Sequence, residues 1–298
     1  MREATSSCNQ GLRTRDIPRQ RCAARASKPG TASASWVVGF TGVQAWAKET
    51  AEYIGRMDRI GPFSLRVARW PGTCQVCGRW PSQPVCPACE ARFAPHRRRC
   101  QGCAEPIEND NGLCGHCRTA PVPRALQTCV AVVDYAFPWD DLVARFKFLH
   151  QSGWAAPLAE LMLRRPEARA LMQTCNRLVP IPVTPSRLAE RGYNQAWELA
   201  KALHRRAAPD SLKALPEALV RVRETADQHL LPREQRLHNL RGAFAAHPDH
   251  VVDLAQAHVL LVDDVTTTGA TLQEAAMALQ QAGAGRVSAL VLARTPSG

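Results

Sequence analysis

Eight of the twelve cysteines form four Cys-x-x-Cys pairs, and no other feature constrains the fold of this 298-residue chain as strongly. The pairs are Cys74 and Cys77, Cys86 and Cys89, Cys100 and Cys103, and Cys114 and Cys117. A Cys-x-x-Cys turn presents two sulfur atoms to one tetrahedral ion, and two such turns complete a closed structural zinc site. The segment has few large apolar side chains and many turn residues, so it needs a cross-link such as a bound metal ion to fold. We therefore expect two structural zinc ions.

Two other chemistries also use paired cysteines. Disulfide bonds need an oxidising compartment, and residues 1–35 contain no apolar core typical of a secretory signal. A thioredoxin-like redox centre has a single pair beside a βαβ unit, whereas four pairs follow one another here. Zinc is favoured, with sequential pairing (74/77 with 86/89, and 100/103 with 114/117) because this pairing closes short loops. An interleaved pairing stays open, and His116 is interpreted as a bystander.

The chain is strongly basic. Its formal net charge is +12 with neutral thiols, and it falls to about +8 when eight thiolates hold two zinc ions. A positive charge of this size attracts phosphates, nucleotides or nucleic acid without selecting one of them. Arg97, Arg98 and Arg99 form a compact basic run, which we interpret as a solvated face or, alternatively, as a contact for a polyanion.

Changes in composition divide the chain into three parts. Residues 1–72 form a basic N-terminal extension that we expect to be partly disordered, although its Arg-rich start also resembles an organelle transit segment or a nucleic-acid-binding arm. Residues 73–122 form a double zinc ribbon, and residues 123–298 form an α/β domain. No stretch approaches the roughly 18 uninterrupted apolar residues of a membrane-spanning helix. We expect no membrane insertion and a cytoplasmic location.

From Ala125 onward, aliphatic strands alternate with amphipathic helices. Strands are expected at 128–135, 178–182, 218–222, 258–262 and 286–293, and helices at 138–149, 154–164, 193–206 and 271–282. Alternation of this kind, with near-continuous aliphatic strands, predicts a parallel sheet with helices on both faces. Ligands of such folds bind at the carboxyl ends of the strands.

One strand end carries most of the functional information. Asp263 and Asp264 follow an aliphatic strand and precede a turn rich in hydroxyl groups, which leads into a helix. Backbone N–H groups at the helix start, together with the Thr hydroxyls and a sharp turn at Gly269, form a nest for a phosphate. The two acidic side chains suit vicinal hydroxyls or a hydrated metal ion, so the pattern indicates a ribose 5-phosphate site. The residues of this hydroxyl loop are Thr266, Thr267, Thr268, Gly269, Ala270 and Thr271.

This strand end resembles the phosphoribosyl diphosphate (PRPP) motif of type I phosphoribosyltransferases, and the whole arrangement over about residues 73–298 resembles the ComF family. Members of that family join a cysteine-rich zinc module to a phosphoribosyltransferase-like domain. A second matching element is Pro180-Ile181-Pro182, followed by Arg187 and then by Arg191-Gly192-Tyr193-Asn194-Gln195. A third matching element runs from Arg221 to Phe244. Thr266 departs slightly from the superfamily pattern, in which an aliphatic or other bulky residue is commoner.

The resemblance implies a type I phosphoribosyltransferase-like fold and a Mg²⁺-dependent transferase that uses PRPP. Asp263 and Asp264 would hold the ribose hydroxyls, and the hydroxyl loop would hold the 5-phosphate. Charge builds up on pyrophosphate as its bond to the anomeric carbon breaks, and positioned Arg side chains and Mg²⁺ stabilise that charge. The candidate arginines are Arg187, Arg191, Arg221 and Arg223.

The acceptor of the phosphoribosyl group is not identified by any set of residues. Phe146-Lys147-Phe148 is interpreted as the end of a core helix without a functional role. Trp139 and Trp154 are large enough to stack on a base, but core packing is favoured.

Three functions therefore stay open. The first is the transferase, linked to nucleotide metabolism or to DNA uptake in natural transformation. The second is a non-catalytic accessory that handles single-stranded DNA, with competence proteins as further partners. The third is a zinc-stabilised protein–protein adaptor. P-loop, Rossmann and zincin motifs are absent from the sequence, which removes those three enzyme classes.

Overall fold

A computed structural model provides the structure of the chain. It describes residues 72–108, 112–119, 124–223 and 242–296. All of them belong to one compact unit, residues 46–298. Almost all of the expected N-terminal extension and most of the third matching element, from Arg221 to Phe244, lie outside the described residues.

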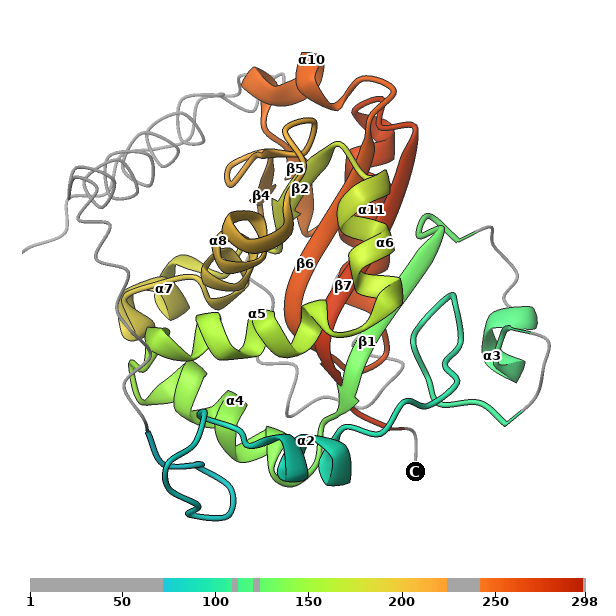
Figure 1. The fold of residues 1–298 in the computed structure, drawn as a ribbon. Coiled ribbons are helices and arrows are strands. Elements are labelled where there is room, and N and C mark those ends of the chain that lie inside the picture. Colours follow the sequence, from blue (N-terminus) through green and yellow to red (C-terminus); the bar gives the residue numbers. More distant parts are fainter. Residues whose placement is uncertain (1–71, 109–111, 120–123, 224–241, 297–298) are drawn as a thin grey trace, which may run out of the picture. The chain divides into compact units, whose positions relative to one another are not determined.

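Five parallel strands form the central sheet in the order β1-β7-β6-β2-β3 (Figure 1). The two longest strands, β6 and β7, lie side by side and stay paired from His258 and Arg286 to Thr266 and Arg294. The predicted parallel α/β sheet is confirmed. The strands are β1 (Thr128–Asp134), β2 (Arg177–Pro180), β3 (Lys213–Ala214), β6 (His258–Thr266) and β7 (Arg286–Arg294).

Helices cover both faces of this sheet, as predicted. Because successive side chains of a strand point to opposite faces, Leu260 and Val262 of β6 pack into one core cluster, and Val259 and Leu261 pack into another. The first cluster includes side chains of α4, α5, α6 and α8, and the second includes those of α11. These helices are α4 (Trp139–Phe148), α5 (Ala155–Leu163), α6 (Pro166–Thr174), α8 (Gln195–Ala207) and α11 (Ala270–Gln281).

The boundaries differ from expectation in two places that concern the site. The strand expected at 258–262 continues to Thr266, because β6 keeps its pairing with β7 beyond Asp263. The strand expected at 218–222 is β4 (Leu219–Arg221), which leaves the main sheet and pairs antiparallel with β5 (Phe244–Ala246). An apolar run alone does not reveal its pairing partner, so this difference was not visible in the sequence.

Several short elements complete the described fold. Among them, α7 begins at a proline, which is a favoured first residue of a helix. No helix in the described ranges combines the length and the apolar character needed to span a membrane. The remaining elements are α2 (Pro87–Phe93), α3 (Gly115–Arg118), η1 (Ser152–Trp154), α7 (Pro185–Arg191), η3 (Pro248–His250) and α10 (Val251–Leu254).

The cysteine-rich segment packs on the α/β part. Trp139, only 1% exposed, donates its indole N–H to the carbonyl oxygen of Phe93 over 2.7 Å. The ring of Phe93 also meets Phe137 edge to face at a centroid distance of 5.4 Å. Trp154 is likewise buried, so both tryptophans serve the core, in agreement with the favoured interpretation.

Candidate functional site

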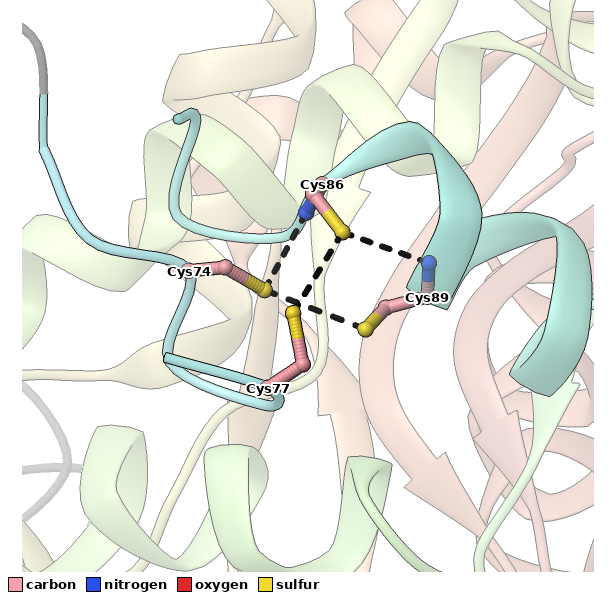
Figure 2. Close-up of side chains that lie close together, drawn as sticks. All are labelled: Cys74, Cys77, Cys86 and Cys89. Atoms are coloured by element: carbon pink, nitrogen blue, oxygen red, sulfur yellow. Dashed lines mark hydrogen bonds between the residues drawn. The ribbon is translucent and has the colours of Figure 1, made fainter. Parts of the chain in front are cut away.

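The first cysteine cluster comprises Cys74, Cys77, Cys86 and Cys89, whose sulfur atoms all lie within 4.8 Å of one another. Figure 2 shows the four side chains converging, with Sγ–Sγ distances of 3.9 Å between Cys74 and Cys89 and 3.7 Å between Cys77 and Cys86. A tetrahedral zinc ion with bonds of about 2.3 Å to sulfur requires sulfur–sulfur distances of about 3.8 Å. The cluster therefore fits zinc.

The second cysteine cluster comprises Cys100, Cys103, Cys114 and Cys117. Its Cys103 and Cys114 sulfur atoms lie 3.6 Å apart, again close to a tetrahedral edge and far from the roughly 2.05 Å of a disulfide. All ten cysteines in the described ranges are free, so the disulfide interpretation is not supported. The sequential grouping is confirmed, and the interleaved alternative is wrong.

Each cluster contains at least one thiol whose pKa is lowered, and in the first cluster the pKa of Cys86 is lowered as well as that of Cys74. Burial disfavours the Cys74 thiolate, but the backbone N–H groups of Cys77 and Cys86 outweigh burial and lower the pKa of Cys74 to about 6. In the same way, burial of Cys100 is outweighed by backbone N–H groups, which lower its pKa to about 7. Zinc binds thiolates, so both clusters are suited to metal at neutral pH.

The two acidic residues of the candidate sugar site lie near the carboxyl end of β6. The Asp263 Oδ1 atom accepts from the backbone N–H of Asp264 at 2.8 Å, and the Asp264 Oδ1 atom accepts from the backbone N–H of Val265 at the same distance. Asp264 is only 2% exposed. Backbone donors therefore fix the orientation of both carboxylates.

Lys147 joins this site and was missed in the sequence analysis. Its Nζ atom lies 2.8 Å from Oδ2 of Asp264. The residue belongs to the last turn of α4, whose side chains Val143 and Phe146 are buried. A lysine one turn beyond Val143, at the edge of an apolar helix face, was the signal that could have identified it.

The pKa of Asp263 is shifted by its surroundings. Burial, followed by the negative charge of Asp264, raises the pKa of Asp263 well above its ordinary value, and the positive charge of Lys147 opposes this rise. Two close carboxyl groups therefore share one ammonium group at the strand end, and their repulsion is only partly offset. Such a place suits hydroxyl donors or a hydrated cation.

Arg191 is a buried cation, and some of its N–H donors lack an acceptor among the described residues. It is 6% exposed, and its Nε and Nη1 atoms have no hydrogen-bond partner in the part of the chain that the structure describes. Burial lowers the pKa of Arg191, whereas the charge of Asp264 raises it. Buried guanidinium N–H groups are costly to leave unpaired, so this arrangement fits an anionic ligand.

The residues that follow Arg191 fix its position. Gly192 ends α7 in the left-handed region at φ 75°, which favours glycine. Asn194 caps α8 by accepting from the backbone N–H of Ala196 at 2.9 Å, and its own amide donates to the carbonyl of Ile181. The Tyr193 hydroxyl donates to the carbonyl of Phe146 in α4. The Arg191–Gln195 motif is therefore a helix junction that holds Arg191 next to α4.

The hydroxyl loop begins inside the strand rather than after it. Thr266 is the last residue of β6 and is 5% exposed. Gly269 precedes α11 at φ 80°, and the Thr268 Oγ1 atom accepts from the backbone N–H of Ala270 at 3.3 Å. Ala270 and Thr271 open the helix, where the first backbone N–H groups have no intrahelical acceptor. The loop therefore has the local structure of an anion site.

The remaining candidate arginines lie on two other elements. Arg187 lies in α7, one turn before Arg191, and the two guanidinium charges interact unfavourably. Arg221 belongs to β4 and lies over the ring of Phe244 at 5.4 Å, and Arg223 follows it. The sheet of β4 and β5 packs against α11. The structure therefore brings together Asp264, Lys147 and Arg191, with Arg187 nearby. It places Arg221 on a separate sheet and Arg223 just beyond the end of that strand.

The basic run at residues 97–99 is engaged within the fold. Arg97 and Arg99 place guanidinium nitrogens 3.1 Å and 2.6 Å from the two carboxylate oxygens of Asp134. Asp134 ends β1, so this pairing ties the cysteine-rich segment to the edge of the sheet. A structural role explains two of the three arginines.

Comparison with known proteins adds independent evidence. The model of a family described as phosphoribosyl transferase domain matches residues 195–298. The chain is 34% identical over 236 residues to the DNA utilization protein YhgH of Escherichia coli (strain K12), covering 76% of this chain and 98% of that protein. It is 33% identical over 236 residues to the protein of the same name in Salmonella typhimurium, with the same coverage. Competence protein F of Haemophilus influenzae is 30% identical over 211 residues, covering 65% of this chain and 90% of that protein.

Proposed function

The chain belongs to the ComF family, and on this premise we propose that it binds PRPP with Mg²⁺ at the carboxyl end of β6 and transfers the phosphoribosyl group. One observation carries the proposal. Lys147 and the buried Arg191 lie around Asp264, directly before the hydroxyl loop. The end of β6 thus combines three features: acidic groups that can bind a diol, cationic donors of Arg191 without partners in the described ranges, and a loop suited to a phosphate.

Each part of this site has a distinct role in the proposal. Asp263 and Asp264 accept hydrogen bonds from the ribose hydroxyls, and the hydroxyl loop (Thr266, Thr267, Thr268, Gly269, Ala270 and Thr271) binds the 5-phosphate. Arg191 and Arg187 bind pyrophosphate oxygens and stabilise the charge that develops as the bond to the anomeric carbon breaks. Arg221 at the end of β4 and Arg223, two residues beyond it, add positive charge. Mg²⁺, when bound with the donor, supplies further neutralisation of the pyrophosphate.

Lys147 has a positioning role in this proposal. Its ammonium group offsets the repulsion between the two adjacent carboxylates, so both can face the sugar. Phe148 supports the neighbouring cation, since the Arg191 guanidinium lies 5.0 Å from the centre of its ring. The last turn of α4 therefore contacts both Asp264, through Lys147, and Arg191, through Phe148.

The two cysteine clusters bind structural zinc in this proposal. Each offers four sulfur ligands, so neither leaves an open coordination position for catalysis. Residues 73–122 accordingly act as a stabilising module on the transferase-like part, residues 123–298.

A test of the sugar-phosphate site needs no knowledge of the acceptor. Titration calorimetry with PRPP and Mg²⁺ should show binding by the natural chain, and Asp264→Asn should weaken it by at least about tenfold. Asp249→Asn is the matched control, because that carboxylate is 85% exposed and belongs to η3. Equal affinity of Asp264→Asn and the natural chain would reject this site.

A second candidate function is a single-stranded-DNA-handling role. The names of the relatives, a DNA utilization protein and a competence protein, and the net positive charge support it. The pairing of Arg97 and Arg99 with Asp134 does not favour the basic run as the contact. Salt-dependent binding of an oligonucleotide to the full chain tests this role. Asp264→Asn should leave that binding intact.

A further inference from the structure

The second cysteine cluster lies directly against the hydroxyl loop. A Cβ atom placed on Gly269 would be 3.9 Å from Cβ of Cys103, which is ordinary van der Waals contact. Gly269 is itself buried. A ligand of the second cluster therefore forms part of the wall behind the loop.

Arg294 reinforces this contact from the end of β7. It is 3% exposed. Its Nε atom donates to the carbonyl of Cys103 at 3.0 Å, and its Nη2 atom donates to a carboxylate oxygen of Glu105 at 2.6 Å. One acceptor belongs to a cysteine of the second cluster, and the other lies two residues after that cysteine. A buried charge with such partners is costly to leave without them.

The same arginine is connected to the strand that carries the loop. Arg294 is aligned with Thr266 in the pairing of β6 and β7, and the backbone N–H of Thr295 donates to the carbonyl of Thr266 at 2.9 Å. The first residue of the hydroxyl loop is thereby linked to Cys103 through the end of β7.

Helix α11, which follows the loop, provides a further link. The Gln273 side-chain oxygen accepts from the backbone N–H of Ala125 at 3.1 Å, and the Gln280 amide donates to the carbonyl of Ala125 at 3.0 Å. Ala125 lies close after the second cluster in sequence, and the backbone N–H of Cys129 donates to the carbonyl of Gln101. Both ends of the loop are thus tied to the second cluster or its flanks.

The first cysteine cluster packs elsewhere. Gln75 accepts from Arg145 of α4 at 3.1 Å, and Glu90 pairs with Arg164, which follows α5. These contacts involve helices of the first core cluster and not the hydroxyl loop. The described residues therefore contain two similar cysteine clusters, of which one contacts the hydroxyl loop.

We infer that zinc in the second cysteine cluster holds the hydroxyl loop in its binding conformation, so that the metal site and the sugar-phosphate site are energetically coupled. The segment around the second cluster has few large apolar side chains, so its fold depends on the metal. Losing zinc frees Cys103 and Glu105 to move, which removes the wall behind Gly269 and two of the three described hydrogen-bond partners of Arg294. Coupling of this kind is reciprocal, so the ligand of the loop also tightens zinc. Only the identity of that ligand rests on the proposed function.

Hydrogen exchange of the zinc-loaded full chain, followed by mass spectrometry, tests the coupling without any ligand. Cys114→Ser removes one ligand of the second cluster, and Cys77→Ser removes one ligand of the first. We expect peptides covering residues 266–272 to exchange about tenfold faster in Cys114→Ser and to be unchanged in Cys77→Ser. Equal exchange of these peptides in the two variants would overturn the inference.

A second variant keeps every zinc ligand in place. Glu105→Gln removes the charge that faces Arg294, and it should accelerate exchange of the same peptides while metal analysis still finds zinc in both clusters. Peptides of β2 and α8 report whether the fold is retained. If Cys114→Ser does not fold, Glu105→Gln decides: acceleration at 266–272 supports the coupling, and unchanged exchange there overturns it.

Zinc release to a chromogenic chelator separates this inference from the proposed function. With PRPP and Mg²⁺ present, one of the two zinc ions should leave about tenfold more slowly. If PRPP does not bind the natural chain but residues 266–272 still respond to Cys114→Ser, the proposed ligand is wrong and the coupling stands. If PRPP binds and those residues do not respond, the coupling is wrong and the ligand stands.

Discussion

The ammonium nitrogen of Lys147 lies 2.8 Å from Oδ2 of Asp264, and both side chains are largely withdrawn from solvent. The pair joins the end of α4 to the end of β6, two elements far apart in sequence. Because Asp264 also lies beside Asp263, the ammonium group balances two carboxylates rather than one. The stability of the folded protein and the capacity of the site for a sugar therefore depend on the same lysine.

Replacing Lys147 by methionine should leave the buried Asp264 carboxylate without its cation. Removing one partner of a buried ion pair costs about 3 kcal/mol or more, so the free energy of unfolding should fall by about that amount. Lys147→Arg keeps the charge and serves as the control, with a much smaller loss. Urea denaturation at pH 8 measures both, and equal stability of the two variants would contradict the interpretation of the pair.

Replacing Asp263 by asparagine should stabilise the ligand-free protein. The pKa of Asp263 is raised by burial and by Asp264, so the folded state binds its proton more tightly than the unfolded state does. The carboxylate therefore costs stability above its ordinary pKa, and the cost grows as pH rises toward the folded-state value. The midpoint of thermal unfolding of Asp263→Asn should exceed that of the natural chain at pH 8. The difference should vanish near pH 4, and a gain that grows toward acid would contradict this sign.

Gly269 should resist substitution because of its backbone and not because of its neighbours. At φ 80°, alanine is strained by about 1 kcal/mol, whereas its Cβ atom has room beside Cys103. We expect Gly269→Ala to lose about that much stability in urea denaturation and to bind PRPP more weakly. Gly153→Ala is the control, since a Cβ atom added there would meet no atom within 4 Å and the φ of Gly153 is not positive. A loss as large in Gly153→Ala would refute the role of the left-handed turn.

Metal analysis should find two zinc ions per chain, one for each cysteine cluster. Cys77→Ser and Cys114→Ser should each retain one, because the clusters share no ligand. Excess chelator should unfold the cysteine-rich segment, which has little apolar core of its own. Loss of both ions from either single variant would contradict two independent sites.

Local sequence patterns predicted the parts of the fold that depend on local structure. The strands around β6 and β7 follow from aliphatic runs, and the grouping of the cysteines follows from the short loops between pairs. Asp263, Asp264 and Gly269 were singled out as candidates because they lie within seven residues of one another in the sequence.

Contacts between distant elements could not be predicted in this way. Lys147 reaches Asp264 only because α4 ends beside β6, and the burial of Arg191 depends on the junction of α7 and α8. The pairing of β4 with β5 depends on tertiary contacts, which an apolar run in the sequence does not specify. Likewise, the contact of Cys103 with Gly269 arises because the cysteine-rich segment packs against the α/β part. The periodicity of apolar residues in the sequence does not predict such packing.

A structure of the zinc-loaded full chain determined with PRPP and Mg²⁺ tests the central claim most directly. We predict density for the 5-phosphate against residues 267–271, with the ribose hydroxyls within hydrogen-bond distance of Asp263 and Asp264 and pyrophosphate oxygens on Arg191. Density for PRPP elsewhere on the chain, or a site left empty at saturating donor, would contradict it.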